Sequence, residues 1–138
     1  MPARILVVDD HEIVRLGVRT LFAKTDSVEI CGEADNGLDA IRLVSELSPD
    51  IVILDLTMPG MNGFEAAERM LTVAPSIKIV FFSAHEIPAT ARTVGAYAFV
   101  SKSSSLPELT DAVNRALQSG KNMHEQQKSF SASNSHSG

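Results

Sequence analysis

The sequence has a single cysteine, no excess of basic residues and no long hydrophobic run. Cys31 cannot form an internal disulfide, and its apolar surroundings, VEICGEA, predict a small buried hydrophobic residue in a reducing compartment. Twelve Lys and Arg against seventeen Asp and Glu give a net charge of -5, which leaves no electrostatic footprint of nucleic-acid binding. The apolar run in MPARILVVDD is too short for a signal peptide or a membrane span, so we expect a soluble, cytoplasmic protein.

Short β-branched runs alternate with longer segments whose apolar residues recur at helical spacing. At 138 residues and 44% hydrophobic content, the chain suits one folded domain with a real core. The short runs predict strands at 4–8, 28–32, 51–54, 77–82 and 98–100. Strands that alternate with helices indicate an α/β fold with a parallel sheet, here with five strands and five helices.

Helix-spaced apolar residues fill the segments between the predicted strands. The fourth of these segments, 88–94, is short and weakly patterned. The other four helices are marked by Ile13, Leu16, Leu21 and Phe22; by Leu38, Ile41, Leu43, Val44 and Leu47; by Phe64, Ala67, Met70 and Leu71; and by Leu106, Leu109, Val113, Ala116 and Leu117.

Capping residues support these boundaries. Asn62 with Glu65, and Ser105 with Glu108, have the spacing of a capping box, and Gly120 is a typical helix stop. The last stretch, KNMHEQQKSFSASNSHSG, has almost no apolar residue. We therefore predict one domain at 1–120 and a disordered tail or linker at 121–138.

One predicted buried strand runs directly into a carboxylate. In DIVILDLTMPGMNG the apolar run is followed by Asp55 and a Met-Pro-Gly turn. An unbroken β-branched run is typical of a parallel strand buried on both faces. Asp55 alone could simply help the chain to turn, so other acids decide whether it has a further role.

A second acidic pair follows the first predicted strand, in RILVVDD. Asp9 and Asp10 could cap the next helix, because carboxylates favour helix N-termini. In known flavodoxin-like sheets of order 2-1-3-4-5, however, strands one and three are neighbours and ligands bind at their carboxyl ends. If the chain has this known topology, Asp9, Asp10 and Asp55 lie together in one small pocket.

Crowded carboxylates repel one another unless protons or a cation intervene, and Mg²⁺ prefers such oxygen ligands. The fourth predicted strand brings Ser83 to the same edge, and the fifth brings Lys102, which could otherwise be a solvated surface lysine. A hydroxyl and an ammonium group beside a metal suit a phosphate. Asp55 can then be a nucleophile, while Mg²⁺ and Lys102 neutralise charge on a transferred phosphoryl group.

These residues resemble the receiver domains of two-component response regulators. The motifs are, in family order, VVDD, ADNG, ILDLTMPGMNG, SAH, GAYAFVSKSS and LPEL, and the resemblance covers 4–119. It implies a signalling protein that accepts a phosphoryl group from a histidine kinase on Asp55 and catalyses only its own phosphotransfer and dephosphorylation. It also implies that Asp10, Asp55 and the backbone carbonyl of Thr57 bind Mg²⁺, with Asp9 acting largely through metal-bound water.

The resemblance implies roles for three further residues. Ser83 and Lys102 would hold the phosphoryl oxygens, and Ser83 and Phe99 would form the conformational switch. From its own sequence context Phe99 could equally be a core residue, and it lacks the hydroxyl of the more usual Tyr. Thr57 and His85 border the path of the hydrolytic water in receivers, although either could be a surface loop residue. His11 follows the acid pair, but no second His or Cys supports it as a metal ligand.

The motifs DLTMPGMNG and SKSSSLPEL most resemble those of regulators with a LuxR-type helix-turn-helix output domain. This chain contains no such module. We therefore expect no direct nucleic-acid binding, and either a stand-alone receiver or a missing output domain. The stretch SAHEIPATARTVG is about one helical turn shorter than in relatives. Because the fourth helix is then short and offers little apolar face, we expect a monomer or a weak dimer.

Three rival functions share parts of this pattern. A dehalogenase-like phosphatase would need an acid two residues after Asp55, where the chain has Thr57. A flavin-binding protein would need a phosphate-cradling loop after the first strand, where DDHE would repel the phosphate. A receiver-like interaction module that is never phosphorylated is the third alternative. The presence of all the reactive residues disfavours it, but the sequence alone does not exclude it.

Overall fold

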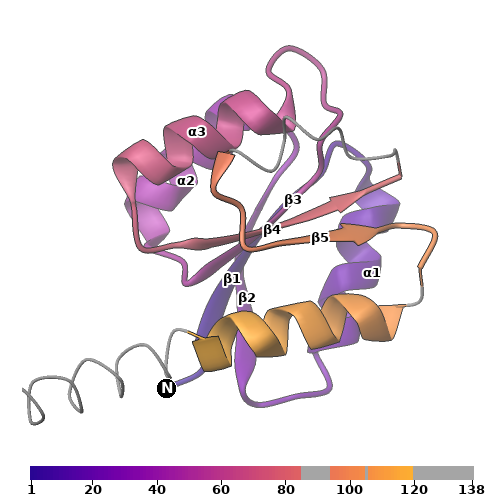
Figure 1. The fold of residues 1–138 in the computed structure, drawn as a ribbon. Coiled ribbons are helices and arrows are strands. Elements are labelled where there is room, and N and C mark those ends of the chain that lie inside the picture. The colour runs from indigo at the N-terminus through magenta and orange to yellow at the C-terminus, as the bar shows by residue number, and fades with distance from the viewer. Residues whose placement is uncertain (85–93, 105, 120–138) are drawn as a thin grey trace, which may run out of the picture.

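The computed structural model describes residues 1–84, 94–104 and 106–119. Its five strands form one parallel sheet of order β2-β1-β3-β4-β5, which confirms the predicted flavodoxin-like topology (Figure 1). The elements are β1 (Ala3–Val8), α1 (Glu12–Phe22), β2 (Val28–Ala34), α2 (Gly37–Leu47), β3 (Ile51–Leu54), α3 (Gly63–Val73), β4 (Lys78–Ser83) and β5 (Ala98–Ser101), followed by a helix at 106–119.

Two hydrophobic cores lie on opposite faces of the sheet. On one face α2 and α3 cover the strands, and on the other α1 and the helix at 106–119 do so (Figure 1). Alternate residues of β1 serve the two cores, because successive side chains of a strand point to opposite faces: Leu6 packs towards α2 and α3, and Ile5 and Val7 pack towards α1. The central strands are therefore apolar along their whole length, as the sequence predicts.

Side-chain caps fix where two helices begin. The amide of Glu65 donates a 2.9 Å hydrogen bond to Oδ1 of Asn62, as expected from the capping-box spacing. Asn36 caps α2 in the same way, with Oδ1 accepting from the amide of Asp39 at 2.9 Å. The sequence analysis missed this second cap.

Several large apolar residues of the helices are exposed to solvent. The large apolar residues exposed on the described helices are Ile13, Leu16, Leu38, Val73 and Leu106. Ile13, for example, is 74% exposed, and α1 contacts the sheet through Val18 and Phe22. Four of the five predicted helices are confirmed within the described residues, although Ile13, Leu16, Leu38 and Leu106, which marked three of them, are exposed.

The edge strand β2 also differs from its prediction. It extends two residues past Gly32, and its register with β1 shifts so that Ile5 pairs with Ile30 and Leu6 with Gly32. Cys31 is therefore the extra residue of a β-bulge on an edge strand. It is only partly buried, which corrects the expected core position, and this burial still raises the pKa of its thiol.

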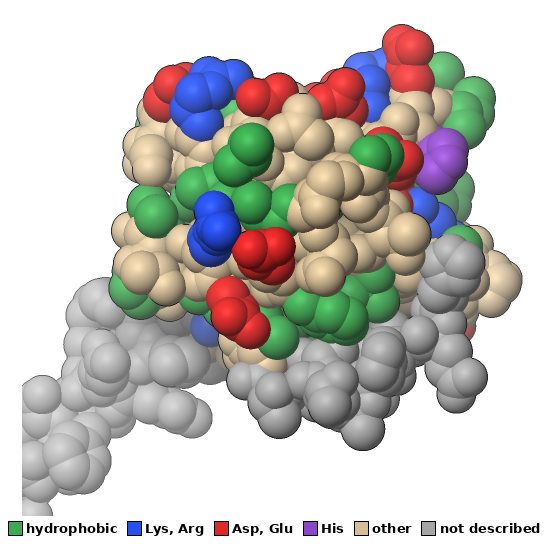
Figure 2. All heavy atoms as spheres, turned by 90° about the horizontal axis from the view of Figure 1, so that it is seen from above, with side chains coloured by type: hydrophobic (Ala, Val, Ile, Leu, Met, Phe, Trp, Pro, Cys, Tyr) green, Lys and Arg blue, Asp and Glu red, His purple; other side chains and the backbone are tan. Residues whose placement is uncertain are grey.

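Several expectations fall outside the described residues. These are most of the short fourth helix, the cap at Ser105, the stop at Gly120 and the tail at 121–138. Among the described residues, no helix is both long and apolar enough to cross a membrane. On the face drawn in Figure 2, basic side chains stand beside acidic ones.

Two matched leucine substitutions test the assignment of buried faces. Leu109 is fully buried, whereas Leu16 is 46% exposed. We expect Leu109→Ala to lower the free energy of unfolding by about 2–5 kcal/mol, because it leaves a cavity. Leu16→Ala should cost about 1 kcal/mol or less. Urea unfolding followed by circular dichroism measures both, and equal losses would show that the buried face of α1 is misassigned.

Candidate functional site

Backbone hydrogen bonds hold the polar residues at the carboxyl edge of the sheet. The amide of Asp9 donates to the carbonyl of Ala34 at 3.0 Å, and that of Asp55 donates to the carbonyl of Val8 at 3.0 Å. The amide of Lys102 donates to the carbonyl of Ser83 at 2.8 Å. The ladder thus continues past the strand ends, and the side chains of these residues emerge at one edge, as parallel topology predicts.

The loop after β3 is held by a glycine at the start of α3. The amide of Gly63 donates to the carbonyl of Leu56 at 2.7 Å. A Cβ atom at Gly63 would lie 2.3 Å from the carbonyl oxygen of Asp55, so any other residue would push the loop away. The final glycine of MPGMNG therefore has a steric role beside Asp55.

Lys102 lies between two buried carboxylates. Its Nζ is 2.6 Å from Oδ2 of Asp9 and 3.6 Å from Oδ2 of Asp55. Asp55 is 4% exposed and Asp9 is also buried. Lys102 is thus a half-buried partner of the acids, and its place here argues against a solvated surface lysine.

The environment of Asp55 opposes its ionisation. Burial raises the pKa of this carboxyl above 3.8, and the charge of Asp9 raises it further. The ammonium group of Lys102 and a hydrogen bond from the amide of Thr57, at 3.4 Å, act in the opposite direction. A further cation near Asp55 would therefore relieve repulsion that one lysine leaves in place.

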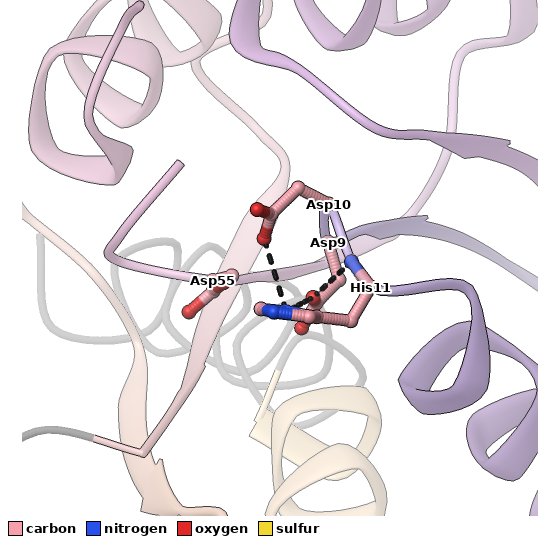
Figure 3. Close-up of side chains that lie close together, drawn as sticks. All are labelled: Asp9, Asp10, His11 and Asp55. Atoms are coloured by element: carbon pink, nitrogen blue, oxygen red, sulfur yellow. Dashed lines mark hydrogen bonds and ion pairs between the residues drawn. The ribbon is translucent and has the colours of Figure 1, made fainter. Parts of the chain in front are cut away.

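Four side chains could hold a metal ion. Ligand atoms of Asp9, Asp10, His11 and Asp55 all lie within 4.8 Å of one another (Figure 3). Oδ1 of Asp10 is buried and accepts no hydrogen bond from the described residues, although Nδ1 of His11 lies 3.2 Å away. An orphaned carboxylate oxygen beside two more carboxylates suits a hard divalent cation such as Mg²⁺. The donor set therefore fits the predicted ion.

Arg15 supports the acidic loop from α1. Its guanidinium donates to the carbonyl oxygen of Asp9 at 2.7 Å and to Oε1 of Glu33 at 3.0 Å. Arg19 also pairs with Glu33. The sequence analysis missed this network, because only the helical spacing of the two arginines was visible, and nothing in the sequence placed Glu33 opposite them.

Ser83 and Phe99 lie on the two neighbouring strands β4 and β5. The ring of Phe99 stacks on that of Phe81, with centroids 5.5 Å apart and an interplanar angle of 14°. Tyr97 packs against the other core, on the opposite face of the sheet. Ser83 is fully buried. His85 is outside the described residues.

An open pocket of about 330 Å³ adjoins these groups. It is lined by Asp10, His11, Asp55, Thr57, Met58, Pro59, Ala84 and Lys102. Two acids and a lysine in its lining suit a small anion delivered to Asp55 together with a cation. Ser83 does not line it, so the structure brings together the acids, Thr57 and Lys102, but leaves Ser83 beneath the surface of the pocket.

The raised pKa of Asp55 predicts an effect on stability. Without divalent cations at pH 7, Asp55→Asn should raise the melting temperature, because it removes a buried charge beside Asp9. The gain should shrink as the pH falls through the raised pKa of Asp55 and should vanish below pH 3.8, where the carboxyl is neutral in both the folded and the unfolded state. Thermal unfolding in EDTA from pH 8 to pH 4 measures this, with the exposed Asp26→Asn as control. A variant that melts lower than the wild type at pH 7 would contradict the argument.

Known proteins share this sequence and fold. Residues 5–114 match the model of the family described as "Response regulator receiver domain". Response regulator GacA of Pseudomonas aeruginosa is 35% identical over 117 residues, which cover 83% of this chain and 55% of GacA. The nitrate/nitrite response regulator protein NarL of Escherichia coli is 38% identical over 118 residues, with coverage of 83% and 55%. The chain thus spans about half the length of these curated relatives.

A solved structure gives the same result. The crystal structure of a two-component response regulator of the LuxR family from Aurantimonas sp. SI85-9A1 superposes with a TM-score of 0.81 at 38% identity. The match covers 86% of this chain and 87% of that one. The order of the strands, the acids at their carboxyl ends and these similarities agree with the resemblance in the motifs. The chain belongs to the receiver domains of two-component response regulators.

Proposed function

We propose that Asp55 accepts a phosphoryl group from a histidine kinase and that the modified domain then changes conformation. The observation that carries the proposal is the position of Asp55: a buried carboxylate at the wall of an open pocket, 3.6 Å from Nζ of Lys102. Family membership makes phosphotransfer the reaction to expect. A carboxylate at the end of a buried strand then has a chemical reason to be there.

In the proposed step an oxygen of Asp55 forms a bond to phosphorus while the bond from phosphorus to the donor breaks. The donor's leaving group departs with the bonding electrons and is protonated afterwards. Lys102 would move from Asp9 towards the phosphoryl oxygens, because its ammonium group can neutralise the charge that they carry. Ser83 would add a hydroxyl donor, which requires the fully buried side chain to become accessible.

The proposed cofactor is Mg²⁺, held by Asp10, Asp55 and the backbone carbonyl of Thr57, with Asp9 acting through metal-bound water. When bound, the ion would neutralise charge between Asp55 and the phosphoryl group. Support comes from the orphaned Oδ1 of Asp10 and from the crowded carboxylates. Asp9 already pairs with Lys102 through Oδ2, which suits a less direct role.

The proposed switch joins Ser83 to Phe99. Phe99 stacks on Phe81, and Phe81 makes an edge contact with Phe64 of α3, with ring centroids 5.6 Å apart. A rotation of Phe99 would therefore disturb a chain of three rings between β5 and α3. Because Phe has no hydroxyl, this switch would act through packing alone.

The remaining parts of the proposal concern the whole protein. A cytoplasmic histidine kinase module would be the phosphoryl donor, and an output domain beyond this chain would regulate transcription. We propose that the domain itself binds neither nucleic acid nor membrane and is a monomer or a weak dimer. The relatives GacA and NarL are named as response regulators, and NarL is named for nitrate and nitrite. The proposal does not extend the signal of either relative to this chain.

Treatment with acetyl phosphate tests the phosphoacceptor. In the presence of Mg²⁺, intact-mass spectrometry should show one phosphoryl adduct that is stable to acid and labile to base. Asp55→Asn should reduce the adduct below detection while keeping the fold, because it removes only the nucleophilic oxygen. A normal adduct on the variant would place the site elsewhere. No adduct on the wild-type protein would favour the interaction module that is never phosphorylated.

Mg²⁺ titration tests the metal ligands separately. Because Mg²⁺ binds the folded state, the melting temperature should rise as the Mg²⁺ concentration increases. At one hundred times the Kd, the free energy of unfolding should be about 2.7 kcal/mol larger than without Mg²⁺. In Asp10→Ala, the same rise in melting temperature should need at least about ten times more Mg²⁺, and phosphorylation should be slower. The exposed Asp26→Ala is the control. An unchanged titration in the Asp10 variant would remove Asp10 from the site.

A further inference from the structure

Arg15 joins the loop that carries two of the acids to the edge strand β2. Its Nη1 donates to the carbonyl oxygen of Asp9 at 2.7 Å, and its Nε donates to Oε1 of Glu33 at 3.0 Å. The side chains of Arg15 and Glu33 are only 17% and 20% exposed. Hydrogen bonds between ionised groups are stronger than neutral ones, so Glu33 holds the guanidinium in the orientation that reaches Asp9.

The carbonyl that Arg15 holds belongs to the peptide group between Asp9 and Asp10. Because a peptide group is planar, a fixed carbonyl also fixes the amide of Asp10, and with it the direction in which both side chains leave the backbone. The amide of Asp9 is held as well, by the carbonyl of Ala34 at 3.0 Å. Two consecutive residues of β2, Glu33 and Ala34, therefore fix the backbone on both sides of Asp9.

The β-bulge in β2 decides the face on which Glu33 lies. Before the bulge, Val28 and Ile30 pack in the core beneath α1, whereas after it Ala34 belongs to the core beneath α2 and α3. Successive side chains of a regular strand alternate between faces, so without a bulge all three would lie on one face and Glu33 on the other. The extra residue, Cys31, reverses the alternation and turns Glu33 towards α1.

We propose that Arg15 is a positioning residue for the proposed phosphotransfer: Glu33 orients it, and it fixes the peptide group between the two acids that follow β1. The carboxylates that would face Mg²⁺ and Lys102 then keep their directions while the site is empty. This role rests on the proposed function and extends the site to a strand at the edge of the sheet. Arg15 itself touches neither the cation nor the phosphoryl group.

A salt bridge that merely packs α1 on β2 is the rival explanation, and Arg19 separates the two. Arg19 lies one turn further along α1 and pairs with the same Glu33. In the part of the chain that the structure describes, it makes no hydrogen bond to Asp9. Loss of either arginine therefore weakens the packing of the helix, whereas only loss of Arg15 releases the loop.

Calorimetric titration with Mg²⁺ tests this role, at a temperature where circular dichroism shows every variant to be folded. Arg15→Met should raise the Kd for Mg²⁺ about tenfold, as is typical when a group that orients a ligand is lost. Arg19→Met should leave the Kd unchanged. Glu33→Ala should raise the Kd in the wild-type protein but not further in Arg15→Met, because Glu33 acts through Arg15. Phosphorylation by acetyl phosphate at limiting Mg²⁺ should slow in the same variants.

The nitrogen resonance of the Asp10 amide supplies a readout that needs no metal. In metal-free protein Arg15→Met should shift this resonance, because the nitrogen shares its peptide group with the carbonyl that loses a hydrogen bond, and Arg19→Met should not. If Arg15→Met does not fold, Glu33→Ala compared with Arg19→Met makes the same test.

An unchanged Kd or an unchanged Asp10 resonance in Arg15→Met overturns the proposed role, and so do equal changes in Arg19→Met. A wild-type protein that neither binds Mg²⁺ nor forms a phosphoryl adduct would instead contradict the proposed function. The Asp10 resonance would then still show whether Arg15 fixes the loop.

Discussion

Repulsion between carboxylates at one edge of the sheet is the constraint on which the site depends. Asp9 and Asp55 are both buried, and one ammonium group, that of Lys102, lies 2.6 Å from the first and 3.6 Å from the second. Removing ions from water costs several kcal/mol each, and a single lysine does not compensate two buried acids with Asp10 beside them. An added positive charge or a proton would therefore stabilise this edge.

The same imbalance gives the site its reactivity in our account. Lys102 pairs with Asp9 in this structure, and a new anion at Asp55 would compete for it. Because Lys102 directly follows β5, where Phe99 stacks on Phe81, a shift of the lysine would be felt in the core between β5 and α3. Charge at the edge is thereby linked to packing within the fold. Two conformations of one packed element are what such a signal needs.

The sequence predicted the sheet well because its central strands are apolar on both faces, which few other structures tolerate. Asp9, Asp55 and Lys102 were found from their places after such strands, since parallel topology sends all strand ends to one edge. Less could be predicted for the helices. Ile13 and Leu16 mark their helix correctly by spacing, but both are exposed, because the face that a helix buries depends on how it packs on the sheet.

The contacts that the sequence could not show all join distant segments. Arg15 reaches the carbonyl of Asp9 and the side chain of Glu33 on the edge strand, and the bulge at Cys31 depends on how β2 pairs with β1. His11 was set aside as a metal ligand because no second His or Cys accompanies it. Only the folded arrangement shows that carboxylates from two strand ends surround its imidazole.

The central claim is that Asp55 is the reactive group and that a cation and Lys102 offset its charge. A crystal structure with Mg²⁺ and beryllofluoride, which imitates a phosphoryl group, tests this most directly. The account predicts beryllium bonded to a carboxylate oxygen of Asp55, Mg²⁺ in contact with Asp10 and Asp55, and Nζ of Lys102 moved from Asp9 to a fluoride. Beryllofluoride bound at another residue, or an unmodified Asp55 with Lys102 still on Asp9 at saturating concentrations, would contradict it.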